Sequence, residues 1–196
     1  MIGRIVLAPQ STDLPPLTWN DCWEGEIVLA SWAGFQTRRG PYAAISSPGQ
    51  SDGSARLIFD TDGAGNVPPT AAQIQAYRWL LDHEDEVSAV VLDTIFTEYP
   101  RFRSEYLDAF EEGDEEAEAT APAITQPTQL RALMGLNAVF ILPMCRDGVG
   151  YVGFEFGCDW EPEHGLGVLT HMNRVVEIGQ ADVAFNSNRA EDDADE

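Results

Sequence analysis

A dense group of reactive side chains lies in the segment GFEFGCDWEPEHGLGV, residues 153–168, between two apolar runs. The segment contains one thiol, four carboxylates, one tryptophan and one histidine. These residue types suit three kinds of site: a metal centre, a catalytic site with a nucleophile or an acid/base pair, and a surface that recognises a partner. Each site needs a different arrangement of the side chains, so the elements that position them decide among the three.

A metal centre could use Cys158, Glu161 and His164. A structural zinc site, however, uses several thiolates or histidines at close spacing, and one Cys and one His six residues apart do not give that pattern. The three cysteines of the chain include no CxxC pair. The segment DTDGAGN at 60–66 begins like a calcium loop, but Ala71 stands where the last carboxylate belongs, which favours a β-turn. We therefore predict no metal and no cofactor.

Catalysis has two candidate sets in the same segment. A cysteine nucleophile would combine Cys158 with His164 and Asp182, whereas acid/base chemistry would use Glu163 with His164. The first set needs a reactive thiol, and an apolar environment raises the pKa of a thiol. The second set needs a turn, because adjacent residues of an extended chain point to opposite sides. A hydrolase built on this segment remains the alternative to a binding protein.

Strand alternation predicts where the side chains of this segment point. If residues 149–158 form one strand, one face carries Val152, Phe154, Phe156 and Cys158, and we assign this apolar face to the core. The opposite face places Glu155 between two glycines, which leaves space beside the carboxylate. Either a bulge or ring from a neighbouring element fills that space, or a ligand does.

The rest of the chain supplies the elements around the segment. Residues 69–73, PTAAQ, are a capping box that starts a helix. A second helical repeat follows at 87–99; Pro100 is expected to stop or kink it, and residues 104–110 are a further helical candidate. A further helix is predicted at 127–134, with Gly135 as its C-cap. Four antiparallel strands are then predicted at 137–142, 149–157, 166–170 and 174–178. Asp147-Gly148 supplies the hairpin turn between the first two strands, and Met172-Asn173 supplies the turn between the last two.

We predict a single α+β domain at residues 1–185, in which a C-terminal antiparallel β-meander packs on several helices. Its parts are a β-rich region at 1–66, a helical region at 67–110, an acidic linker at 111–127 and a helix plus the four-stranded meander at 128–185. Strand candidates in the first part are 5–8, 25–32 and 55–60, with an exposed loop at 46–55. Residues 186–196 are expected to form a disordered acidic tail.

The charge of the chain restricts its partners. There are 33 acidic residues against 11 basic ones, all arginine, for a net charge of −22. The runs at 111–118 and 191–196 hold eleven of the acids, and without these eleven the net charge is still −11. Such charge opposes binding to nucleic acid and to anionic membranes, and it favours a basic protein or a cation. No run approaches a membrane span and no secretory signal is evident, so we expect a cytoplasmic protein.

The block YVGFEFGCDWEPEHGLGVLTHMNRVVEIGQADVAF at 151–185 resembles the signature of an uncharacterised bacterial domain family, in which GFEFGC-x-W leads to EHGLGV and then to RVVEIG-x-AD. The upstream segments LMGLNAVFILP and PTAAQIQAYRWLL resemble the rest of that family, so the resemblance covers most of residues 17–185. At the hairpin tip, where the family pattern places basic residues, this chain keeps only Arg174 as a permanent charge. Families of this size and acidity occur among toxin-immunity proteins, so the resemblance leads us to expect that role for this chain.

These observations favour a non-enzymatic binding protein that masks a basic partner, such as a toxin, over an enzyme. The predicted contact residues are the acids and the tryptophan of the reactive segment: Glu155, Asp159, Trp160, Glu161 and Glu163. In this hypothesis charge complementarity accelerates encounter, and Trp160 supplies the energetic centre if it is exposed. The oligomeric state is left open.

Overall fold

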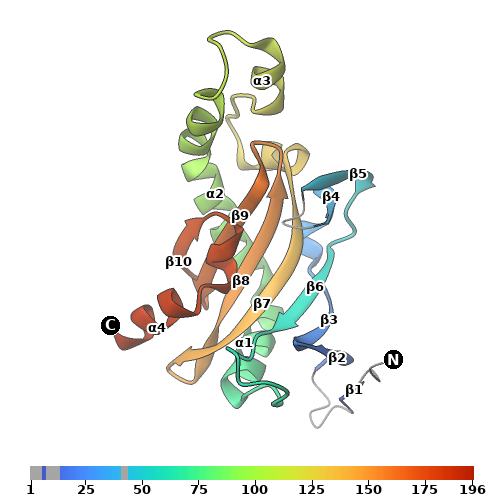
Figure 1. The fold of residues 1–196 in the computed structure, drawn as a ribbon, viewed down its shortest axis with the longest axis vertical. Coiled ribbons are helices and arrows are strands. Elements are labelled where there is room, and N and C mark those ends of the chain that lie inside the picture. The colour runs from blue at the N-terminus through green and yellow to red at the C-terminus, as the bar shows by residue number, and fades with distance from the viewer. Residues whose placement is uncertain (1–5, 8–13, 41–43) are drawn as a thin grey trace.

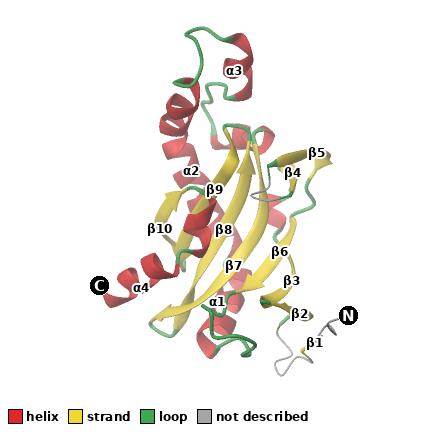
Figure 2. Cartoon of the chain, viewed as in Figure 1, coloured by secondary structure: helices red, strands yellow, loops and turns green. Residues whose placement is uncertain are grey.

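The computed structural model describes residues 6–7, 14–40 and 44–196. Among these residues, eight strands form one mixed sheet in the order β1-β2-β3-β6-β7-β8-β9-β10, and β4 pairs with β5 in a small second sheet (Figures 1 and 2). The strands of the large sheet are β1 (Val6–Leu7), β2 (Leu17–Asn20), β3 (Cys22–Val28), β6 (Ser54–Phe59), β7 (Met134–Arg146), β8 (Val149–Cys158), β9 (Glu161–His171) and β10 (Arg174–Gly179). The small sheet consists of β4 (Gln36–Arg39) and β5 (Ile45–Gln50).

Four α-helices and three short 3₁₀ segments accompany the sheets in the described part of the chain. They are α1 (Ala71–Asp82), α2 (Glu84–Leu107), α3 (Glu115–Thr120), α4 (Ser187–Asp195), η1 (Ala30–Trp32), η3 (Pro127–Ala132) and η4 (Ala181–Phe185). The prediction of an α+β fold with a C-terminal meander is confirmed. None of the described helices is long and apolar enough to cross a membrane.

The meander β7-β8-β9-β10 follows from local turn chemistry. Asp147 and Gly148 adopt φ angles of 54° and 79°, and Met172 adopts 54°. Positive φ angles match the right-handed twist of two-residue hairpins, for which Asp-Gly is a preferred sequence. Strand β6 joins the meander by pairing in parallel with β7, whereas the other neighbouring strands are antiparallel.

The predicted capping box begins α1 and also ties it to the sheet. The Gln73 backbone N–H donates to Thr70 Oγ1 at 3.2 Å, and the Thr70 N–H donates to Gln73 Oε1 at 2.9 Å. Gln73 Nε2 additionally donates to the carbonyls of Asp60 and Ile141 at 2.7 and 2.8 Å. The same side chain therefore caps the helix and connects it to the end of β6 and to the middle of β7.

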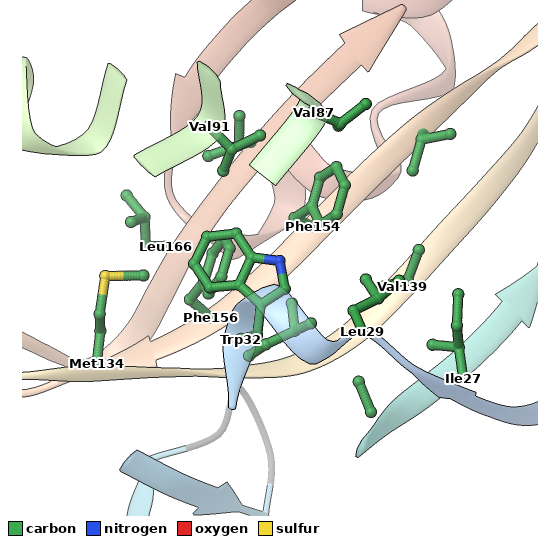
Figure 3. Close-up of a cluster of buried hydrophobic side chains, with 14 of the residues drawn as sticks. Ile27, Leu29, Trp32, Val87, Val91, Met134, Val139, Phe154, Phe156 and Leu166 are labelled. Atoms are coloured by element: carbon green, nitrogen blue, oxygen red, sulfur yellow. The ribbon is translucent and has the colours of Figure 1, made fainter. Parts of the chain in front are cut away.

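Both faces of the sheet are covered in its C-terminal part, β7–β10. Helices α1 and α2 lie behind the sheet in Figure 1 and enclose the main core. Figure 3 shows the part of this core around Trp32. The ring centroid of Trp32 lies 5.0 Å from that of Phe35 and 4.9 Å from that of Phe156. The opposite face is covered by η4 and α4. Beneath them lies a second cluster, formed by Leu142, Tyr151, Leu169, Val183 and Ala190.

Several boundaries predicted from the sequence are wrong. Helix α2 continues through Pro100 to Leu107, and the acidic run contains α3, which is capped by Asp114 and bound to α2 through the ion pair of Arg103 with Glu118. The segment at 127–134 is the 3₁₀ segment η3 followed by β7, so Gly135 is a strand residue. Residues 187–195 form α4, where a disordered tail was predicted.

The N-terminal predictions also change. Strand β5 occupies half of the segment predicted as an exposed loop at 46–55. The strand predicted at 25–32 ends earlier, because η1 follows β3. The strand predicted at 5–8 extends outside the described residues, and its described part is β1.

Candidate functional site

The thiol of the reactive segment is enclosed by the main core, as strand alternation predicts. Val152, Phe154, Phe156 and Cys158 all belong to that core, and Cys158 is fully buried. Burial raises the pKa of the Cys158 thiol, and the sulfur lies 3.9 Å from the carbonyl oxygen of Glu161. His164, the candidate base, is exposed, whereas Cys158, the candidate nucleophile, is buried. Asp182 is exposed as well, so the three residues do not form a catalytic triad.

The opposite face of β8 is not open, contrary to the prediction for Glu155. A Cβ on Gly153 would lie 1.6 Å from the carbonyl oxygen of Ala184, so the backbone of η4 fills the space left by this glycine. Glu155 is only 5% exposed and accepts a hydrogen bond from Asn137 Nδ2 at 3.2 Å. Its burial raises the pKa of the carboxyl group. Glu155 is therefore an internal residue, and it does not reach the surface to contact a partner.

We expect Glu155→Gln to keep the fold and to raise the free energy of unfolding by about 1 kcal/mol near pH 8. The folded-state pKa of Glu155 lies above its ordinary value, so the wild-type fold loses stability as the pH rises through that pKa. The advantage of the variant should shrink as the pH falls towards about 4, where the unfolded carboxyl also takes up its proton. Urea unfolding at the two pH values measures the difference, and a variant that is less stable near pH 8 would contradict the assignment.

The turn after β8 is anchored from two sides. The Asp159 carboxylate pairs with Arg38, whose side chain is only 2% exposed, and accepts from Gln36 Nε2 at 2.9 Å. Trp160 is 3% exposed and meets Tyr99 of α2 edge to face, with ring centroids 5.0 Å apart. Two more predicted contact residues are thus engaged inside the protein. Trp160 is too deeply buried to serve as an exposed hot spot.

Beyond this turn, β9 carries a large bulge that projects the remaining acids. Cys158 pairs with Glu161 and Phe156 pairs with Leu166, so residues 162–165 face a single residue of β8. Proline lacks the N–H needed for the ladder, and Gly165 rejoins the strand at φ 63°, a conformation that favours glycine. The strand thus replaces the loop predicted at 159–165, and it leaves Glu163 and His164 exposed.

The bulge forms one wall of a groove whose other wall is the C-terminal half of α2. This groove, called the α2–β9 groove below, has a volume of about 430 Å³. Its aromatic lining consists of Phe102, Tyr106, Phe110 and Trp160, and its charged lining consists of Arg101, Glu105, Glu161 and Glu163. Phe110 is 43% exposed, and its ring centroid lies 5.0 Å from that of Tyr106.

The electrostatics of the groove are negative. Among the described lining residues, three glutamates face one arginine, which gives a net charge of −2. Arg101 donates to Glu98 at 3.0 Å and to Glu105 at 2.8 Å, and its guanidinium lies 4.4 Å from the centroid of the Phe102 ring. Arg101 is therefore held by two carboxylates, of which Glu105 lines the groove, and by an aromatic face, which is the way proteins commonly bind such a cation.

The contact residues predicted from the sequence include the β9 wall of this groove but not the α2 wall. The signal for the second wall is present: Phe102, Tyr106 and Phe110 recur every four residues, which is one face of a helix. The prediction that the helix ends at Pro100 separated these aromatic residues from the core pattern of α2.

The metal alternative is not assembled. In the described ranges, no group of three His, Cys, Asp or Glu side chains could hold a metal ion. Cys158 is buried on the core side, whereas His164 lies on the exposed bulge with Nδ1 3.1 Å from Glu161 Oε1. Residues 60–66 form turns, as predicted, and Asp60 Oδ1 accepts from the Asp62 N–H at 2.9 Å.

Comparison with known proteins gives one match. The model of a family described as a domain of unknown function, DUF6985, matches residues 23–185. Neither a comparison with curated proteins nor one with solved structures gave a match. The matched region extends from β3 to the end of η4, so it includes both walls of the α2–β9 groove but not α4.

Proposed function

We propose that this chain, which belongs to the DUF6985 family, is a non-enzymatic binding protein whose α2–β9 groove takes a basic segment of a partner protein. The observation that carries the proposal is the groove itself, whose lining combines four aromatic rings with three glutamates. A lysine or arginine side chain places its apolar stem on aromatic surface and its charge beside carboxylates. The net charge of −22 would attract a basic partner over a longer range.

In this proposal the contact set differs from the one predicted from the sequence in three of its five residues. Glu161 and Glu163 remain, joined by Glu105 and Tyr106 from α2 and by Phe110 just after that helix. Asp159 and Trp160 act indirectly. They hold the turn before the bulge in place, Asp159 next to the end of η3 and Trp160 against Tyr99 of α2. A toxin neutralised by masking its basic active surface is the partner class that best suits such a groove, and an immunity protein is the biological role that follows.

We expect the double reversal Glu161→Arg/Glu163→Arg to weaken partner binding about 100-fold, since two attractive contacts become repulsive. The matched control is Asp192→Arg/Asp195→Arg, which makes the same change of net charge at exposed positions of α4. Affinity purification from the native host, followed by binding measurements with the protein recovered, tests the groove. Equal losses in both variants would show that only net charge matters and would remove the groove from the proposal.

A second candidate function rests on the pair formed by His164 and Glu161 on the bulge, whose 3.1 Å contact resembles an acid/base dyad. Both side chains are substantially exposed, 54% and 36%, so water screens their interaction. This candidate predicts a stoichiometric metal or a turnover activity that His164→Ala removes. Elemental analysis of the purified protein is the direct comparison, and a bound metal lost in that variant would place the enzyme ahead of the binding protein.

A further inference from the structure

A group of charged side chains lies on the opposite face of the sheet, beneath α4. Helix α4 comes after the region matched by the DUF6985 family, and it packs across β7 and β10 (Figure 1). Its principal buried group is a carboxylate: the Asp193 residue is 1% exposed. The only other residue of α4 that is fully buried in the described structure is Ala190.

The groups around the Asp193 carboxylate come from three strands of the family domain. Arg174 of β10 donates from Nη1 to Oδ1 at 2.9 Å and from Nη2 to Oδ2 at 2.6 Å, which is a bidentate pair. Tyr151 of β8 donates its hydroxyl to Oδ2 at 2.8 Å. Arg146 of β7 lies 3.6 Å from Oδ2 and donates to the Asp193 backbone carbonyl at 2.8 Å. These interactions hold the pKa of Asp193 well below its usual range.

Tyr151 and Arg146 also contact a residue of the sheet, His171. Tyr151 is itself fully buried, and its ring centroid lies 4.9 Å from that of His171, whose Nε2 is 3.1 Å from the Arg146 carbonyl oxygen. Tyr151 and His171 thus have their own places in the sheet. Two guanidinium groups face one carboxylate here, in a chain whose acids outnumber its arginines three to one.

Helix α4 has little else to hold it. It is nine residues long, shorter than an isolated helix that is stable in water. Besides Ala190, a partly buried Ala194 touches the apolar cluster beneath it, and Arg189 lies 3.8 Å from Glu177 of β10. The helix therefore depends on docking for its structure, and its docking depends mainly on one carboxylate.

We propose that Tyr151, Arg146 and Arg174 form a carboxylate-recognition site of the DUF6985 domain, and that α4 is a displaceable internal ligand of this site. The ligand class is a short acidic helix with an Ala-x-x-Asp pattern, in which the alanine meets the apolar cluster and the aspartate enters between the guanidinium groups. An acidic helix supplied in trans binds the same site once α4 is released. In the intact chain α4 outcompetes it, because tethering gives α4 an effective concentration near the millimolar range.

The test uses the full chain and a fluorescent peptide of residues 186–196. Asp193→Asn in the chain is expected to release α4 and raise amide hydrogen exchange at 187–195 about 100-fold, since it removes one partner of a buried charge pair. The peptide then binds this variant at least about 10-fold more tightly than it binds the wild-type chain. Asp192→Asn, which makes the same charge change at an exposed neighbouring position, is expected to behave as the wild type.

Specificity for the carboxylate is tested by giving the peptide itself the Asp193→Asn change, which should abolish its binding. Ala190→Glu in the chain provides a second way to release α4 if Asp193→Asn prevents folding, and it should create the same peptide affinity. Unchanged exchange of α4 in Asp193→Asn, or release of α4 without peptide binding, would overturn the proposal.

Discussion

Replacement of Gly153 by alanine is expected to lower the free energy of unfolding by about 3 kcal/mol or more. The added Cβ would lie 1.6 Å from the Ala184 carbonyl oxygen and 2.5 Å from the carbonyl carbon. Both are backbone atoms, so no side-chain rotation relieves the contact and η4 has to move away from the sheet. That movement exposes Val183 and Ala184, which are buried against β8 and β9 in the native fold.

The control for this prediction is Gly148→Ala in the hairpin turn of the same sheet. Gly148 has a φ of 79°, which disfavours a side chain, but no neighbouring atom lies within 4 Å of the added carbon. Its cost is therefore limited to the backbone conformation, about 1 kcal/mol. Urea unfolding followed by circular dichroism compares the two variants. A Gly153→Ala protein as stable as Gly148→Ala would contradict the close packing of η4 on β8.

Arg38→Ala is expected to cost about 3 kcal/mol, because it leaves Asp159 in a partly buried site without its charge partner. Arg38 also donates from Nε to Gln36 Oε1 at 2.7 Å and from Nη2 to the Leu133 carbonyl at 3.3 Å. The loss therefore weakens the junction of β4 with the turn that carries the bulge of β9. We expect the α2–β9 groove to loosen, with faster hydrogen exchange at residues 159–165.

Two further variants separate the ion pair from a general effect of losing an arginine. Arg39→Ala changes the exposed neighbour and should cost less than about 0.5 kcal/mol. Adding Asp159→Asn to Arg38→Ala removes the unpaired carboxylate and should restore part of the lost stability. If Arg38→Ala and Arg39→Ala unfold at the same urea concentration, the buried pair does not hold the turn.

The features predicted correctly from the sequence are those set by neighbouring residues. Thr70 and Gln73 lie three residues apart and form the capping box that starts α1. Asp147-Gly148 closes a hairpin because both residues tolerate a positive φ angle. Alternation along β8 places Phe154, Phe156 and Cys158 on the core side. In each case the cause and its consequence lie within one element.

The errors arise where a distant segment determines the environment. Glu155 was predicted as a partner-contact residue, but η4, about 30 residues away in the sequence, covers that side of β8. The acidic segment after residue 186 is helical because Asp193 finds partners on β7, β8 and β10. Single-strand periodicity contains no information on which segment covers the second face of a sheet.

Pro100 shows the same effect in α2. A proline removes one helical hydrogen bond and favours a break, but residues on both sides of it are held by other elements. Tyr99 is buried against Trp160 and donates its hydroxyl to the Pro122 carbonyl at 2.9 Å, and Arg103 donates to the Ala121 carbonyl at 2.8 Å. These tertiary contacts keep the helix continuous and bring Phe102, Tyr106 and Phe110 to the groove.

The most direct test of the proposed binding function is site-specific photocrosslinking in the native host. A photoreactive phenylalanine analogue is placed at Phe110, in the α2–β9 groove, or at Val28, a more exposed apolar position on β3 outside it. We predict a crosslink from position 110 to a basic segment of one protein, absent from position 28 and lost when Glu161 and Glu163 are reversed to arginine. The same product from position 28, or none from position 110, would contradict the groove as the binding site.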